Sequence, residues 1–80
     1  MTHQEAAQAL SNNTIKWAKN GTEKTMPYQP GVEMTARKIG RRGNSVRVEI
    51  IDITVAGDKS RWIGQVVTLN EIAAAIHFSA

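Results

Sequence analysis

Cysteine is absent from this sequence of 80 residues, and long apolar runs are absent as well. Without cysteine, the chain can form neither a disulfide nor a cysteine-based zinc site. No apolar stretch reaches the roughly 18 residues that span a bilayer. The first residues, Met1 to Glu5, also lack the basic and then apolar pattern of a signal peptide. We therefore expect a cytoplasmic protein that does not contact a membrane.

Aromatic residues are scarce, at 5% of the chain, while hydrophobic residues make up 41% and charged residues 21%. This balance is typical of a folded globular domain rather than of a disordered or membrane-spanning chain. We expect one domain over residues 1–80, and a chain of this length buries only about 60% of the surface that its unfolded form exposes. Packing and helix capping are therefore left to stabilise a small core, with self-association as a homodimer as a further option.

The segment from Thr2 to Asn20 has helical periodicity. Thr2 and Glu5 have the spacing of a capping box, and Asn20-Gly21 is typical of the end of a helix. Ser11-Asn12-Asn13 interrupts the segment with side chains that compete for backbone hydrogen bonds. The segment is therefore either one helix or two helices separated by this break.

The middle of the chain has the alternating pattern of β-strands. Before it, the polar stretch 22–31 contains two prolines, and we interpret it as a connector because proline restricts the preceding residue to extended conformations. Apolar and polar residues then alternate in 32–37 and 46–50, with a glycine-rich turn between them, which predicts a β-hairpin. The apolar positions shift by one residue at Ile51, which indicates a β-bulge or a strand buried on both faces.

A third strand is expected over 61–67. Thr68 and Glu71 repeat the capping-box spacing and predict a short C-terminal helix. The predicted fold class is thus α+β, with two helices covering one face of a three-stranded antiparallel sheet. A winged-helix-like fold and an SH3-like small barrel with helices are the alternatives. The expected core consists of Val32, Met34, Val48, Ile50, Ile53, Trp62, Val66, Leu69, Ile72 and Ile76.

Residues that carry catalytic or metal-binding chemistry are not grouped along the chain. His3 and His77 lie at opposite ends, each without a second histidine or a carboxylate at ligand spacing. Glu49 and Asp52 are three residues apart in a predicted strand, so they point to opposite faces unless the bulge realigns them. The glycines at 40 and 43 are not accompanied by a Walker A lysine. The sequence therefore predicts a protein that is not an enzyme and that uses neither a metal nor a cofactor.

Positive charge is concentrated around the turn of the predicted hairpin. The net charge is +3, and no acidic residue lies between Glu33 and Glu49 to offset the cationic side chains there. Guanidinium groups bind phosphate and carboxylate alike, so this turn can bind either a nucleic acid or an acidic protein surface. The candidate binding residues are Arg37, Lys38, Arg41, Arg42 and Arg47, extended on the next turn by Lys59 and Arg61.

Two functions are consistent with this cluster. The first is a small non-enzymatic module whose basic hairpin binds DNA or RNA. Only Tyr28 is expected to be exposed for stacking on bases, because the periodicity around Trp17 and Trp62 assigns these residues to the core. The second function is that of a small inhibitor or adaptor, of the kind that bacteriophages and mobile elements direct against host protein complexes. A third interpretation involves no ligand: the cationic side chains at the turn are solvated and discourage aggregation.

One stretch resembles a family of DNA-binding domains. Glu5–Leu10, followed by Ser11–Thr14 and then Ile15–Gly21, is similar to the helix-turn-helix of excisionase-like and MerR-like domains, in which the following strands form a wing. This resemblance covers about a quarter of the chain. It implies that Thr14, Lys16 and Lys19 face the major groove and that Arg41 and Arg42 lie in the wing.

A second stretch looks like part of a small β-barrel. Gly31–Ile50, together with Arg61–Gly64, is similar to the hairpins of SH3-like barrels such as Tudor and KOW modules. This resemblance implies a barrel rather than an open sheet.

Overall fold

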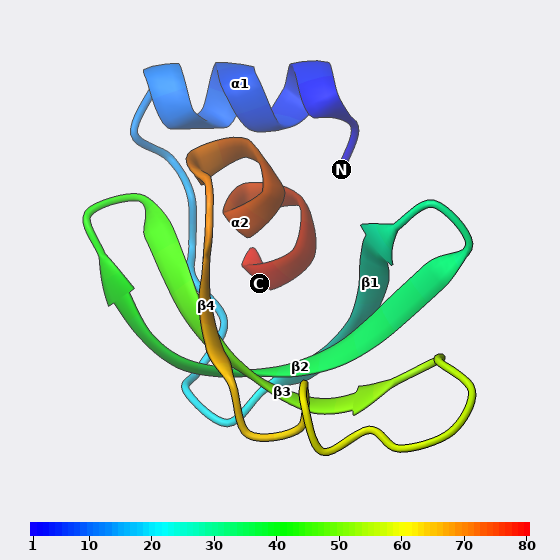
Figure 1. Ribbon diagram of the computed structural model, residues 1–80. Helices are drawn as coiled ribbons and strands as arrows, with labels where there is room; N and C mark the ends of the chain where they lie inside the picture. The colour runs from blue at the N-terminus through cyan, green and yellow to red at the C-terminus, as the bar shows by residue number, and fades with distance from the viewer.

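Two helices and four strands make up the computed structural model, which describes residues 1–80. Their order is α1 (His3–Ser11), β1 (Glu23–Gln29), β2 (Val32–Arg42), β3 (Ser45–Ile53), β4 (Val66–Leu69) and α2 (Glu71–Phe78). The strands form one antiparallel sheet in sequence order. Figure 1 shows the sheet curled around α2, with α1 lying across α2 on the side away from the sheet. The α+β class is confirmed, whereas the expected number of three strands is wrong.

The additional strand, β1, lies in the stretch 22–31 that we interpreted as a connector. Pro27 is tolerated there because β1 is an edge strand, where a missing amide need not remove a hydrogen bond between strands. Pro30 and Gly31 form the two-residue turn to β2. Gly31 has a φ of 77°, which the second central position of a type II turn requires. The two prolines therefore belong to a hairpin rather than to a connector.

The N-terminal helix α1 ends at the predicted break. Thr2 and Glu5 form the expected capping box, in which Glu5 N donates to Thr2 Oγ1 at 3.1 Å and Thr2 N donates to Glu5 Oε1 at 2.8 Å. After Ser11 the chain turns, and Asn13 adopts the left-handed conformation with a φ of 54°. Asparagine tolerates this conformation better than most residues, which explains why the helix stops here.

Residues 14–20 do not form the second helix of a helix-turn-helix. The backbone of 14–20 instead pairs with the end of the chain, where Ala18 N donates to Phe78 O at 2.7 Å and Trp17 forms a β-bridge with Ser79. The helix-turn-helix implied by the resemblance is therefore wrong, and with it the winged-helix alternative. β1 and β4 are the two edges of the sheet and do not pair with each other, so the sheet is not a closed SH3-like barrel.

Two β-bulges interrupt the pairing of β2 with β3. The first is one of the two alternatives that the shift in apolar phase indicated: the sheet pairs Thr35 with Asp52 and Ala36 with Ile50, which leaves Ile51 as the extra residue. Bulges bend a sheet and increase its twist. This one therefore contributes to the curvature that lets the sheet enclose α2.

The second bulge lies in β2 and was not predicted. Lys38 pairs with Val48, and the next pair joins Gly40 to Arg47, so Ile39 has no partner. Because an extra residue exchanges the two faces of a strand, every side chain of β2 beyond Ile39 faces the opposite way from where simple alternation would place it. A glycine inside a strand pattern often marks a bulge, and Gly40 was therefore the available signal.

The core lies between the concave face of the sheet and α2. Of the expected core residues, Met34, Val48, Ile50 and Ile53 are buried, whereas Val66 is 46% exposed. On α2 the expected Ile72 and Ile76 are only half-buried. The buried residues that we did not predict are Ala6, Met26, Ala36, Lys38, Val46, Ala74, Ala75 and Phe78. Neither helix is long and apolar enough to cross a membrane.

The second helix, α2, begins at a different cap from the predicted one. Asn70 Oδ1 accepts a hydrogen bond from Ala73 N at 2.9 Å, while Thr68 still belongs to β4. Loss of an N-cap side chain costs about 1 kcal/mol. We therefore expect Asn70→Ala to lower the free energy of unfolding by about 1 kcal/mol in urea denaturation. Thr68→Ala should have a much smaller effect, and equal effects of the two substitutions would contradict this cap assignment.

Candidate functional site

The hairpin of β2 and β3 ends in a two-residue turn, Gly43-Asn44, between the paired residues Arg42 and Ser45. Gly43 has a φ of 61°, as the first central position of a type II′ hairpin turn requires. The turn lies at the left of Figure 1. Three arginines surround it, and we refer to them as the basic tip: Arg41, Arg42 and Arg47.

The bulge at Ile39 distributes the basic tip over both faces of the hairpin. Arg41 pairs with Val46, which is fully buried, and directly paired residues share a face, so Arg41 lies on the concave face. Arg42 and Arg47 lie on the outer face, which neither helix covers. Without the bulge, Arg41 would face outward instead of Arg42.

Arg42 and Arg47 line a single hollow on the outer face, with a volume of about 430 Å³. Its other lining residues are Ser45 and Thr68, and Thr68 lies beside Arg47 because β3 and β4 pair these two residues. No acidic residue lines the hollow, and neither arginine forms a salt bridge. Two guanidinium groups and two hydroxyl groups are all able to donate hydrogen bonds, so the hollow has the chemistry to bind an anion.

Arg41 is held against Trp17 on the concave side of the tip. Its guanidinium carbon lies 5.1 Å from the centre of the indole ring, and its Nη1 donates to the carbonyl oxygen of Gly43. A cation–π contact at an exposed site contributes about 0.5–1 kcal/mol. Trp17 is half-buried and packs against the core, as expected. The core residue Trp17 therefore fixes one of the three arginines of the tip.

Arg37 lies on the outer face, but two carboxylates offset its charge. Its guanidinium group lies 3.2 Å from Glu23 Oε2 and 3.8 Å from Glu49 Oε1. Glu23 belongs to β1, the strand that we took for a connector, so the sequence pattern could not reveal this neighbour. We therefore do not include Arg37 in the basic tip.

Lys38 is only 5% exposed and lies on the concave face. Its Nζ donates to Asn20 Oδ1 at 2.7 Å. Its backbone also pairs with the segment before β1, because Gly21 N donates to Lys38 O at 2.7 Å and Lys38 N donates to Thr22 O at 2.9 Å. The expectation that Lys38 belongs to an exposed cluster is therefore wrong, because it joins residues 20–22 to the hairpin.

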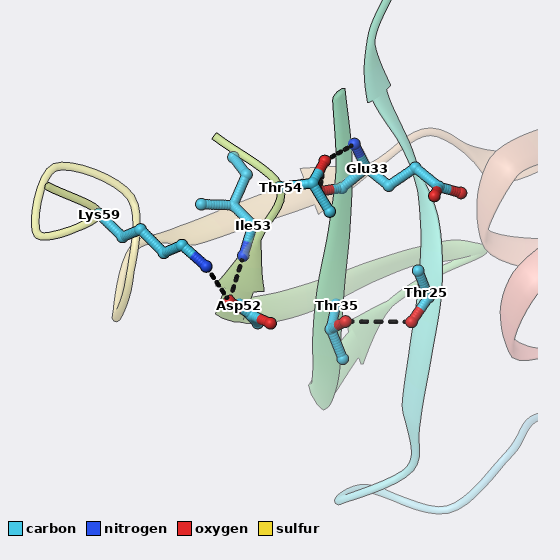
Figure 2. A network of polar contacts seen from close by, with 7 residues as sticks. All are labelled: Thr25, Glu33, Thr35, Asp52, Ile53, Thr54 and Lys59. Atoms are coloured by element: carbon cyan, nitrogen blue, oxygen red, sulfur yellow. Dashed lines mark hydrogen bonds and ion pairs between the residues drawn. The ribbon is translucent and has the colours of Figure 1, made fainter. Parts of the chain in front are cut away.

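The other two predicted binding residues lie in the loop between β3 and β4, at the end of the sheet away from the tip. Lys59 Nζ donates to Asp52 Oδ1 at 3.0 Å, which Figure 2 shows beside the Thr25–Thr35 side-chain pair. This hydrogen bond has the largest effect in holding the pKa of Asp52 below its usual value, and the hydrogen bond from Ile53 N has the next largest. Arg61 stacks on its neighbour Trp62 at 5.4 Å. The structure therefore does not bring Lys59 and Arg61 together with the tip.

The two histidines lie closer together than their positions in the chain indicated. Because α1 packs on α2, His3 and His77 line the same hollow, together with Glu71. Burial lowers the pKa of His77. No three histidine, aspartate or glutamate side chains in the chain lie close enough together to hold a metal ion.

Three residues of the site were not among the predicted binding residues. Ser45 could have been found, since it flanks the turn opposite Arg42 in the hairpin that alternation predicted. Thr68 could not, because its position depends on the register of β4. Trp17 reaches the tip only because 14–20 folds back against the end of α2, and no sequence pattern signals that path.

Comparison with known proteins does not identify this site. No family model, curated protein or solved structure matches the chain. The role of the basic tip is therefore inferred from its charges and its geometry.

Proposed function

We propose that the protein is a small non-enzymatic module that binds nucleic acid through the basic tip. The observation that carries this proposal is the hollow between Arg42 and Arg47, which faces no carboxylate and adds two hydroxyl groups to two unpaired guanidinium groups. Arginine forms charge-assisted hydrogen bonds to phosphate, often two from one guanidinium group. A phosphate group of the nucleic-acid backbone would occupy the hollow.

Contacts to phosphate position a protein on a nucleic acid, whereas contacts to base edges determine sequence preference. Tyr28, the aromatic residue expected to stack on bases, is half-buried against the core and lies at the end of β1 away from the tip. The exposed chemistry of the tip is thus cationic rather than aromatic. We therefore propose binding to DNA and RNA alike, with little sequence preference.

The test is a titration of the protein with duplex DNA, single-stranded DNA and RNA at several salt concentrations, followed by fluorescence anisotropy of a labelled oligonucleotide. Affinity should fall linearly with salt on a double-logarithmic plot, by a slope of about 0.9 for each phosphate bound on duplex DNA and about 0.7 on single strands. Absence of binding to all three at low salt would overturn the proposal.

A second candidate function is binding to an acidic protein surface, as an inhibitor or adaptor. Carboxylates accept the same guanidinium hydrogen bonds as phosphates. Two apolar residues of the sheet are exposed: Ile39 of the central strand β2 is 39% exposed, and Val66 of the edge strand β4 is 46% exposed. The buried centre of a protein interface is more apolar than the rest of the surface and is enriched in arginine, so exposed apolar residues on a surface with arginines are consistent with this function. Binding to an acidic protein that is weakened by Val66→Ser, without binding to any of the three nucleic acids, would favour this function over nucleic-acid binding.

A further inference from the structure

The segment Lys16–Lys19 is fixed beside the concave side of the basic tip. One attachment is to the end of α2, through the hydrogen bond from Ala18 N to Phe78 O at 2.7 Å and that from Ala80 N to Lys16 O at 2.6 Å. The other attachment is to the hairpin, through the stack of Arg41 on Trp17. The segment therefore has a defined position relative to the tip, although Lys19 and Arg41 lie 22 positions apart in the chain.

Lys16 and Lys19 are both exposed, and neither forms a salt bridge. No acidic residue occurs between Glu5 and Glu23, so nothing within this part of the chain offsets their charge. Lys16 lies one position and Lys19 two positions from Trp17, on which Arg41 stacks. Because consecutive Cα atoms are about 3.8 Å apart, the backbone of both lysines is close to that of Trp17. The positive charge on the concave side of the tip therefore continues onto a segment from the first quarter of the chain.

We propose that Lys16–Lys19 is a second part of the nucleic-acid-binding surface. A strand that passes over the end of the hairpin contacts both parts: one phosphate occupies the hollow on the outer face, and Lys16 and Lys19 bind further phosphates on the concave side. Trp17 is a positioning residue that holds Arg41 between the two parts. This inference rests on the proposed function. It also specifies the ligand, which must be a strand with several phosphates in a row rather than a mononucleotide.

The role of Trp17 follows from the cost of ordering a flexible side chain. Immobilising one side chain with many rotamers on binding costs about 0.5–1.5 kcal/mol, and a residue that is already ordered avoids that cost. The ring of Trp17 and the carbonyl oxygen of Gly43 order Arg41 before any ligand binds. Because Arg41 itself is exposed, its remaining N–H groups can still reach a phosphate.

The lysines are tested with the double variant Lys16→Gln plus Lys19→Gln. Each phosphate contact on duplex DNA contributes about 0.9 to the salt slope, so the slope should fall by about 1.8. The matched control, Lys24→Gln plus Arg61→Gln, removes the same charge from two exposed residues that form no salt bridge and lie outside this surface. Equal changes in slope for the two variants would overturn the inference.

Trp17 is tested by a double-mutant cycle with Arg41. Trp17→Leu should weaken binding about two- to fivefold, and Trp17→Phe, which keeps an aromatic face, should recover part of this loss. In the Arg41→Ala background, Trp17→Leu should have no further effect on affinity, because the residue that it positions is already gone. A purely structural role would give the same loss in both backgrounds, and that result would overturn the positioning role.

The outcomes separate this inference from the proposed function. If the chain binds no nucleic acid, both fail. If the chain binds and the arginines of the hollow matter, but the lysine variant behaves like its control, only the inference fails. Urea denaturation of each variant establishes that affinities are compared between folded proteins.

Discussion

Replacing Arg42 and Arg47 together with alanine is expected to weaken binding to duplex DNA by about a hundredfold at low salt. Hydrogen bonds to charged groups contribute about 1.5–3 kcal/mol each, and 1.4 kcal/mol corresponds to a tenfold change in affinity. The double variant removes both guanidinium groups from the hollow and leaves only the hydroxyl groups of Ser45 and Thr68. The slope of affinity against salt should also fall by about 0.9, because the one phosphate that occupies the hollow is no longer bound.

The matched control for this variant is Arg37→Gln plus Lys59→Gln. It changes the net charge by the same amount, but its two cations already have carboxylate partners in Glu23, Glu49 and Asp52. We expect it to reduce affinity severalfold at most, through the general field of the protein. If this control weakens binding as much as the hollow variant does, the affinity reflects net charge, and the basic tip is not a specific binding site.

These two variants distinguish residues that the sequence placed in one cluster. Alternation and turn glycines were sufficient to indicate the hairpin, its tip and the bulge at Ile51. All three depend only on two strands, β2 and β3, that follow each other directly in the sequence. One of the two carboxylates that offset the charge of Arg37 is that of Glu23, which lies 14 residues away and is brought near only by β1. The error about one strand therefore became an error about one site residue.

The second bulge shows a different limit of sequence patterns. Gly40 carried a signal for it, but the consequence falls on its neighbours: Arg41 and Arg42 exchange faces. Two adjacent arginines look equivalent in the sequence, yet one stacks on Trp17 and the other lines the hollow. The side of the hairpin on which each charge lies is set by pairing register, and it is therefore a property of the sheet rather than of the local sequence.

Phe78→Ala is expected to cause the largest loss of stability, about 3–5 kcal/mol. Phe78 is the largest fully buried side chain, and it packs between α2 and the concave face of the sheet. Folded proteins are stable by only about 0.05–0.15 kcal/mol per residue, so this loss is comparable to the total for a chain of 80 residues. Urea denaturation should show a variant that is largely unfolded, or close to it, without denaturant.

Ile76→Ala is the comparison for Phe78→Ala, because Ile76 is also apolar and on α2 but only half-buried. Its loss should be clearly smaller, and equal losses would contradict the position of the core. Phe78 also accepts the hydrogen bond from Ala18 N that fixes the segment Lys16–Lys19. Partial loosening of α2 should therefore free Trp17 from Arg41 before the hairpin itself unfolds, which connects the stability of the core to the geometry of the basic tip.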